Sequence, residues 1–329
     1  MKQYHVYGLG AALVDTEIEV TDDFLQTANI EKGLMTLVDE TRQSELLELM
    51  KDHLVGSKRA SGGSACNSII AASYFGAKTF YSCKVANDEN GQFFHHDTKA
   101  AGVSIQTRDL PAGTTGKCLV MITPDAERTM NTFLGISATL DESQLDHSAI
   151  AQSEYLYLEG YLVTSPTGKS AAIKAREIAE QNNVKTSISL SDPGMVQFFG
   201  DGLKEMIGTK VDLLFCNKDE ALGWTKTETI EQAVEAMKAS ARTFAITLGK
   251  EGALVFDGEQ LTRVAGESVS AIDSNGAGDM FAGAFLYAIT AGNTFPEAAK
   301  LANKAAAKVV SQYGPRLKPE QHALLKTFR

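Results

Sequence analysis

The half of the chain from residue 155 onward alternates two hydrophobic patterns, and this alternation constrains the fold more than any other feature. Apolar runs typical of strands occur at Tyr155–Leu158, Thr186–Leu190, Val211–Cys216, Phe244–Leu248 and Ala253–Phe256. Segments with helical character lie at Ser170–Gln181, Gly202–Ile207, Ile230–Ser240, Gly276–Ala291 and Phe295–Gln312. Strands that alternate with helices predict a parallel sheet with crossover helices. Such sheets bind ligands at the carboxyl ends of their strands.

The first half of the chain is organised differently. We predict a short strand at Val6–Gly8, a helix at Leu46–Val55, and a hairpin formed by Lys117–Thr123 and Arg128–Thr132. No low-complexity linker divides the sequence, so we expect one domain over residues 1–329. The β-rich segments at about 14–38 and 113–134 are expected to pair as a small discontinuous sheet that covers a site on the main sheet.

Composition narrows the class of partner. The 41 acidic residues outnumber the 31 basic ones, and the net charge of −10 argues against nucleic acid and anionic membranes as partners. No apolar run has the length of a membrane span or of a signal peptide core, so a cytoplasmic location is expected. The cysteines form no CxxC pair, which argues against a zinc site. Their even number would allow disulfides, but a chain of this length does not need them, so we expect reduced, mostly buried thiols at Cys66, Cys83, Cys118 and Cys216.

Three glycine-containing stretches imitate nucleotide motifs without meeting their requirements. YGLGAALVD (Tyr7–Asp15) has Leu13 where a dinucleotide fingerprint needs its third glycine. SPTGKSAA (Ser165–Ala172) has Val163 where a P-loop needs its first glycine, and we interpret it as a helix start with a solvated Lys169. AGTTGKC (Ala112–Cys118) lacks the spacing of a P-loop.

The stretch DSNGAGD (Asp273–Asp279) carries the clearest chemical signal. Small residues at Gly276, Ala277 and Gly278 expose successive amides at the start of a helix, where the helix dipole binds anions. Asp279 follows in the first turn. A helix cap is the plain interpretation, but a carboxylate beside an anion site also suits a general base that faces a hydroxyl during phosphoryl transfer.

Three other stretches carry weaker signals, each with a structural alternative. Gly62 and Gly63 allow close approach of a ligand, Ser64 is suited to cap the next helix, and Asn67 could bind a hydroxyl or simply be a satisfied polar side chain. Asn217 and Glu220 could order Mg²⁺ through water, form a capping box, or do both. The last set could line a nucleotide or form a simple hairpin, and consists of Thr247, Gly249 and Gly252.

Together these stretches resemble the ribokinase-like (PfkB) family of carbohydrate and nucleoside kinases. The two signature regions of the family correspond to Gly62–Gly91 and Asp273–Phe285. Its other motifs correspond to NKDE (Asn217–Glu220), TLGKEG (Thr247–Gly252) and ANKAAA (Ala302–Ala307). The resemblance spans nearly the whole chain. It implies an α/β fold with a doubly wound, mostly parallel sheet flanked by helices and a small β-sheet lid, and it implies ATP and Mg²⁺ as cofactors.

The resemblance also implies roles for single positions. Asp279 would take the proton of a primary hydroxyl, and the anion hole would consist of Gly276, Ala277 and Gly278. The positions that match those holding sugar hydroxyls are Asp15, Gly62, Gly63 and Asn67. The positions that match nucleotide contacts are Asn217, Glu220, Thr247, Gly249, Gly252 and Asn303, with Glu220 acting on Mg²⁺ through water. Family members often bind K⁺, which Asp273 would serve with backbone near Gly314.

The segment DAERTMNTFLGIS (Asp125–Ser137) resembles the lid of bacterial members described as adenosine or sugar kinases. Candidates to touch the substrate are Arg128, Met130, Asn131 and Phe133, and the Phe133 ring could either stack on a purine or pack within the lid.

The sequence therefore predicts an ATP-dependent kinase that phosphorylates a primary hydroxyl of a furanose-containing small molecule, with a nucleoside such as adenosine favoured. A sugar kinase of the ribokinase, fructokinase or ketodeoxygluconate kinase type is the alternative. Less favoured are a non-catalytic nucleoside- or sugar-binding protein of the same fold, because Asp279 is intact, and a nicotinamide dehydrogenase, because of Leu13. Exposed lid sheets can pair, so a homodimer is a further expectation.

Overall fold

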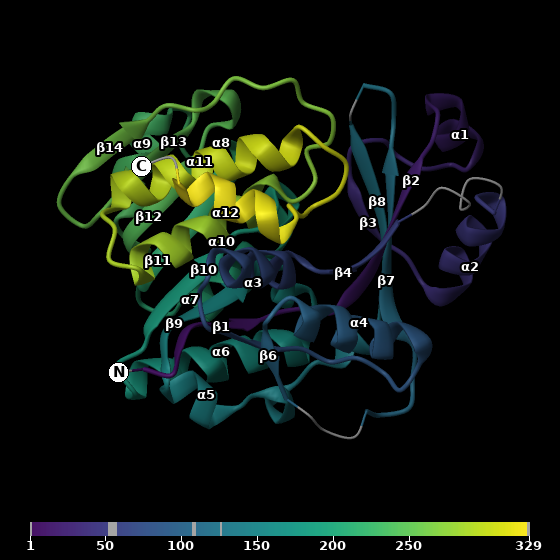
Figure 1. Cartoon of the computed structure of the whole chain (residues 1–329), viewed down its shortest axis with the longest axis horizontal. Helices are drawn as coiled ribbons and strands as arrows, with labels where there is room; N and C mark the ends of the chain where they lie inside the picture. The colour runs from purple at the N-terminus through teal and green to yellow at the C-terminus, as the bar shows by residue number, and fades with distance from the viewer. Residues whose placement is uncertain (1, 52–57, 107–109, 126, 328–329) are drawn as a thin grey trace.

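Nine strands form the main sheet of the computed structural model, which describes residues 2–51, 58–106, 110–125 and 127–327. The strand order is β14-β13-β12-β11-β10-β9-β1-β5-β6 (Figure 1). All neighbours are parallel except at β12–β13 and β13–β14. The strands are β1 (Tyr4–Leu9), β5 (Thr79–Ser82), β6 (Ser104–Ile105), β9 (Ser153–Glu159), β10 (Lys185–Ser189), β11 (Val211–Asn217), β12 (Ala241–Thr247), β13 (Ala253–Phe256) and β14 (Leu261–Val264). The order reverses between β1 and β9, which confirms the doubly wound fold.

A second sheet of five strands lies beside the first, in the order β3-β8-β7-β2-β4 (Figure 1). Its strands are β2 (Leu13–Glu19), β3 (Met35–Leu37), β4 (Lys58–Gly62), β7 (Thr115–Ile122) and β8 (Arg128–Gly135). The small sheet predicted from the sequence is thus present, with β7 and β8 as its hairpin. It also includes β4, which is antiparallel to β2 and which the sequence pattern did not reveal.

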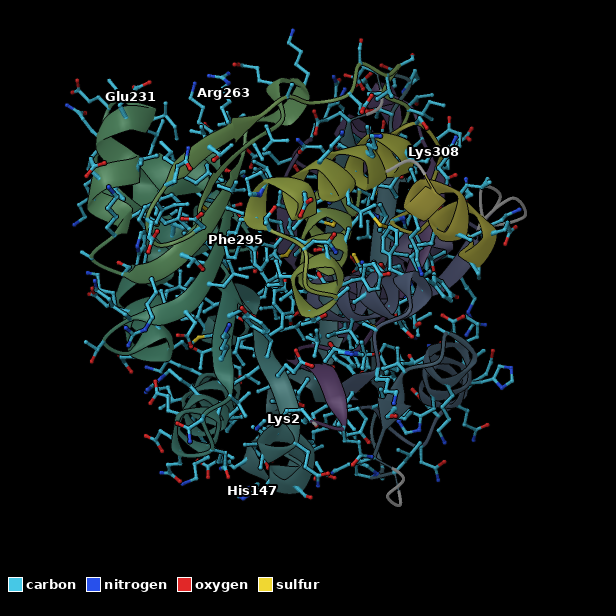
Figure 2. The ribbon with its side chains drawn as sticks, turned by 60° about the vertical axis from the view of Figure 1, so that its left-hand side comes forward. Lys2, His147, Glu231, Arg263, Phe295 and Lys308 are labelled. Atoms are coloured by element: carbon cyan, nitrogen blue, oxygen red, sulfur yellow. The ribbon has the colours of Figure 1, made fainter. Side chains whose placement is uncertain are left out.

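Helices cover both faces of the main sheet because each face is apolar (Figure 1). One face packs against α3 (Ser64–Phe75), α4 (Glu89–Ala100), α10 (Ala277–Thr290), α11 (Phe295–Val310) and α12 (Pro319–Thr327). The other packs against α5 (His147–Ala151), α6 (Pro166–Gln181), α7 (Pro193–Ile207), α8 (Lys218–Thr225) and α9 (Ile230–Met237). Two hydrophobic cores result, one on each side of the sheet. Charged side chains such as Glu231, Arg263 and Lys308 lie at the periphery (Figure 2).

Two more helices, α1 (Asp22–Thr27) and α2 (Glu40–Leu49), cover the small sheet on one face. Leu25 of α1 and Leu46 of α2 form a separate core with Ile18, Leu119 and Met121 of the sheet. The opposite face of this sheet is turned toward the main domain, where it helps to enclose a cavity.

Two helix predictions had wrong boundaries. The helix predicted at Leu46–Val55 starts earlier, because Asp39 caps it, and α2 ends at Leu49, while residues 52–57 lie outside the described part of the chain. The helix predicted at Gly202–Ile207 begins at Pro193, where Asp192 accepts a hydrogen bond from the Gly194 N–H. A break in helical geometry at Phe199 interrupts its apolar period. Among the described residues, no helix is long and apolar enough to cross a membrane.

Replacement of Phe285 tests the core between α10 and the sheet. This fully buried ring packs edge-on against Phe215 of β11 and Phe295 of α11, at centroid distances of 5.6 and 5.1 Å. We expect Phe285→Ala to lower the free energy of unfolding by about 3–5 kcal/mol, because it leaves a cavity. Phe198 on α7 is 73% exposed, so Phe198→Ala should change it by less than about 0.5 kcal/mol. Equal losses in urea titrations would contradict this account of the core.

Candidate active site

One cavity of about 390 Å³ lies between the two sheets. Its floor is formed by residues at the carboxyl ends of the parallel strands, including Glu159, Ser189, Asn217 and Thr247. The small sheet supplies the opposite wall. This position agrees with the rule that doubly wound sheets bind ligands where the strand order reverses. Predicted site residues from distant parts of the sequence meet in its lining: Asp15, Gly63, Asn67, Asn217, Glu220, Thr247, Gly249, Gly276, Ala277, Gly278 and Asp279.

Asp279 lies at the amino end of α10, but its side chain does not cap that helix. The N-cap residue is Gly276, and α10 has no side-chain cap hydrogen bond. Instead, Asp279 Oδ1 accepts a hydrogen bond from Ser64 Oγ at 2.6 Å, and Oδ2 accepts one from Asn67 Nδ2 at 3.1 Å. The prediction that Ser64 caps α3 was therefore wrong, because Gly63 is the N-cap and the hydroxyl is turned to Asp279. The first N–H groups of α10 therefore donate no hydrogen bond to the carboxylate in their own first turn.

The surroundings of Asp279 suit a proton acceptor. Burial raises the pKa of this carboxyl above its usual range, although hydrogen bonds from Ser64 and Asn67 and the charges of Arg128 and Arg316 act in the opposite direction. A carboxylate with a higher pKa is a stronger base. The local chemistry thus combines a base with an anion-binding helix end.

Gly62 explains how Asp15 reaches the cavity. A Cβ atom on Gly62 would lie 2.1 Å from the Asp15 carboxyl group, so only glycine leaves room for that side chain between β2 and β4. Gly62 itself lies behind Asp15, outside the cavity lining, whereas Gly63 belongs to it. Burial raises the pKa of Asp15 to about 7, and the charge of Arg316 limits the rise.

Asn217 and Glu220 form the predicted capping box at the start of α8. The Glu220 carboxylate accepts hydrogen bonds from the Asn217 backbone N–H at 3.0 Å and from its Nδ2 at 2.7 Å, and Asn217 Oδ1 accepts one from the Glu220 N–H. Burial raises the pKa of Glu220 to about 7. With both oxygens already hydrogen-bonded, Glu220 fits Mg²⁺ held through water better than a direct bond to the ion. The Mg²⁺ role stays a prediction.

Two predicted nucleotide contacts lie away from the cavity lining. Asn303 of α11 donates hydrogen bonds from Nδ2 to the carbonyl oxygens of Val264 and Ala265, at 3.1 and 3.0 Å. Gly252 packs tightly against the Val264 carbonyl in the turn before β13. In this structure the two residues hold the segment that follows β14, while Thr247 and Gly249 line the cavity.

Strand β8 presents alternate residues to the cavity. Arg128, Met130, Thr132 and Leu134 line it. The predicted contacts Asn131 and Phe133 lie on the other face of β8, which α2 covers, and are absent from the lining. A strand exposes every second side chain to each face. The register of the lid therefore turns Asn131 and Phe133 away from the cavity, which corrects the prediction that they contact the substrate. Phe133 is half-buried and does not line the cavity, so its ring is not placed to stack on a purine there.

The buried Asp273 organises the loop before α10. Its carboxylate accepts hydrogen bonds from the N–H groups of Asn275 at 2.8 Å and Gly314 at 2.9 Å. Asn275 Oδ1 in turn accepts a hydrogen bond from Arg128 Nη1 of the lid at 2.9 Å. The predicted proximity of Asp273 and Gly314 is present, and the K⁺ role stays a prediction.

Sequence reasoning missed two charged residues of the site. Glu159 at the end of β9 accepts hydrogen bonds from the Ala11 and Ala65 N–H groups, at 2.6 and 2.8 Å, and so joins the end of β1 to the start of α3. Burial raises the pKa of Glu159 to about 7. Its signal was available, since an acid closes the apolar run YLYLE. The other is Arg316, which follows α11 and contacts Asn67.

The family model, the solved structures and the curated relatives that match this chain all describe kinases of carbohydrates or nucleosides. Residues 37–322 match the family model described as pfkB family carbohydrate kinase. The crystal structure of an adenosine kinase from Sinorhizobium meliloti is 34% identical, with a TM-score of 0.92 and 99% of each chain covered. A probable sugar kinase from Rhizobium etli CFN 42 gives the same values. The adenosine kinase of Schizophyllum commune is 25% identical over 97% of this chain and 98% of its own.

A pair of glycine substitutions tests the loop before α10. Gly276 has φ of 73°, and a Cβ there would lie 2.6 Å from the Pro315 Cα, whereas Gly278 has no heavy atom within 4 Å of such a Cβ. We expect Gly276→Ala to lower the free energy of unfolding by at least about 1–3 kcal/mol. Gly278→Ala should leave it unchanged or raise it by up to about 1 kcal/mol, as in a helix. Similar losses for both in urea titrations would contradict this difference.

Proposed function

Because this chain belongs to the pfkB family of carbohydrate kinases, we propose that it transfers the γ-phosphoryl group of ATP to a primary hydroxyl of a nucleoside, with adenosine as the favoured substrate. The observation that carries the proposal is the position of Asp279 beside the N-terminus of α10, held by Ser64 and Asn67 instead of capping its own helix. This arrangement places a base and an anion site next to each other, as phosphoryl transfer requires.

In the proposed reaction, Asp279 accepts the proton of the primary hydroxyl while the hydroxyl oxygen bonds to the γ-phosphorus. The bond from that phosphorus to the bridging oxygen breaks, and ADP leaves. The N–H groups of Gly276, Ala277 and Gly278 bind the oxygens of the transferred group, and the helix dipole favours their charge. Arg128, hydrogen-bonded to Asn275, adds a positive charge from the lid.

The metal and nucleotide would bind on the other side of the cavity. Asn217 and Glu220 would hold Mg²⁺ through its water ligands, and the ion would neutralise phosphate charge. Thr247 and Gly249 would line the nucleotide. We place this reaction in the cytoplasm, as expected from the sequence.

The walls of the cavity favour a substrate with an apolar ring and a polar sugar. Leu13, Met35, Leu37, Met130 and Leu134 of the small sheet form an apolar wall where a base could lie. Asp15 and Asn67 stand nearby as partners for hydroxyl groups. A free sugar would leave most of the apolar wall without a partner. The relatives described as adenosine kinases support the same substrate.

A sugar kinase remains the second candidate, since the similar structure from Rhizobium etli is described as a probable sugar kinase. A substrate panel separates the two. With ATP and Mg²⁺, we expect ADP release with adenosine to exceed that with ribose, fructose or ketodeoxygluconate by at least about tenfold in kcat/KM, because only the nucleoside fills the apolar wall. Preference for a free sugar would overturn the substrate, and no ADP release with any compound would favour a non-catalytic binding protein.

Substitution of the base tests the mechanism separately. We expect Asp279→Asn to lower kcat by about 10²–10⁴-fold, because the amide cannot accept the proton. ATP affinity, measured by calorimetry, should stay within about twofold. Asp201→Asn provides a control, since that side chain is 95% exposed on α7. Turnover by Asp279→Asn close to that of the unsubstituted protein would rule out this residue as the base.

A further inference from the structure

Arg316 is the centre of a hydrogen-bond cluster directly behind the site. Its Nε donates to Asn67 Oδ1 at 3.2 Å, Nη1 to Asp97 Oδ2 at 2.9 Å, and Nη2 to Ser61 Oγ at 2.9 Å. Ser61 also hydrogen-bonds to Asp97, so two of the three partners are joined to each other as well as to Arg316. The arginine side chain is only 14% exposed. A guanidinium with three directed donors fixes its neighbours more strictly than a single charge does.

The loop that carries Arg316 is itself fixed to the proposed anion site. The Gly314 N–H donates to Asp273, and Pro315 packs against Gly276 so closely that no side chain fits there. Arg316 therefore belongs to the same rigid unit as the start of α10. The position of Arg316 relative to Asp279 is thus fixed by the contacts between the Gly314–Pro315 backbone and the loop before α10.

The bond from Arg316 determines which way the Asn67 amide faces. With Oδ1 accepting from Arg316, Nδ2 is turned to Asp279 and donates one hydrogen bond to it. An amide nitrogen has two protons, so one donor of Asn67 remains for a ligand in the cavity. If Asp279 becomes protonated during turnover, it could itself donate to an amide oxygen, and the two orientations of Asn67 would compete. The bond to Arg316 prevents that exchange.

We propose that Arg316 is a positioning residue, which locks the Asn67 amide so that it presents a donor to a substrate hydroxyl and to Asp279, while Asp15 presents the matching acceptor. This inference rests on the proposed kinase function. It assigns to Arg316 the recognition of the sugar part of the substrate and no contact with the nucleotide. Asp15 would then accept a hydrogen bond from the substrate hydroxyl, and Asn67 would donate one to the oxygen of that hydroxyl.

The charges around Asp279 provide a second readout. Arg128 of β8 and Arg316 of the C-terminal loop both lower the pKa of Asp279, and Arg316 lowers that of Asp15 as well. Asp15 and Glu159 line the same cavity as Asp279. Burial is the largest cause of their raised pKa values, and the charge of Asp279 raises both further. Phenols of the surrounding strands and of the turn after β9 complete the ionisable neighbours: Tyr81, Tyr157 and Tyr161. Loss of the Arg316 charge should raise the pKa of the base.

Arg176 offers a matched control. Its side chain is also 14% exposed and also bonds to a carboxylate, that of Glu180, at 2.9 Å. It lies on α6 and is absent from the cavity lining in the described part of the chain. Arg176→Gln thus reproduces the loss of a buried arginine without touching Asn67.

The test compares Arg316→Gln, Arg316→Lys and Arg176→Gln with the unsubstituted protein in ADP-release assays across pH. We expect Arg316→Gln to raise the KM for adenosine by about tenfold, leave the KM for ATP within about twofold, and move the acidic limb of kcat/KM to higher pH. Arg316→Lys keeps the positive charge but lacks the branched guanidinium donors. We therefore expect the acidic limb of its kcat/KM profile to lie where it does in the unsubstituted protein, while its KM for adenosine stays as high as that of Arg316→Gln. Arg176→Gln should change neither.

Ser61→Ala removes one hydrogen-bond acceptor of Arg316 without changing the charge of the cluster. This variant tests the positioning role of Arg316 if Arg316→Gln does not fold. A rise of a few fold in the KM for adenosine with an unchanged acidic limb supports the proposal, and an unchanged KM overturns it. The proposal is also overturned if Arg316→Gln shows the kinetics of Arg176→Gln, or raises both KM values equally. Absence of ADP release from the unsubstituted protein would instead overturn the proposed function itself, and this inference with it.

Discussion

The hydrogen bonds that Asp279 accepts from α3 are the contacts on which the site depends. A carboxylate in the first turn of a helix normally satisfies the N–H groups of that helix. Here Ser64 and Asn67 take both oxygens, which leaves the N-terminus of α10 available for another anion. The arrangement requires the starts of α3 and α10 to meet, and both helices pack on the same face of the main sheet. Fold and chemistry are therefore linked by one pair of side chains.

The same cavity gathers four acidic groups, and their burial is costly. The pKa values of Asp15, Glu159 and Glu220 are raised to about 7, and that of Asp279 is also raised. Carboxyl groups with folded pKa values above their unfolded ones contribute stability below the unfolded pKa, and that contribution is lost as pH rises toward 7. The molecule thus gives up stability at neutral pH to keep these groups together. Such a trade is expected at a functional site.

Local patterns predicted six of the nine strands of the main sheet, and β5, β6 and β14 were not predicted. Long-range contacts explain the errors at the site. The strands from β9 to β13 follow from short apolar runs, and the Asp279 loop and capping box follow from residues close in sequence. The faces of β8 depend instead on its register with β7 and β3, so Asn131 and Phe133 were assigned to the wrong side. Arg316 gave no local signal, because its partners Ser61, Asn67 and Asp97 lie more than 200 residues earlier.

The covering of the small sheet bears on the expected homodimer. Leu25 and Leu46 of α1 and α2 pack against Ile18, Leu119 and Met121, so the face that a second copy could use is filled by the chain's own helices. Exposing such side chains costs about 1.5–3 kcal/mol each. The free energy of pairing through this face would have to offset several such losses. The other face turns toward the cavity of the same chain.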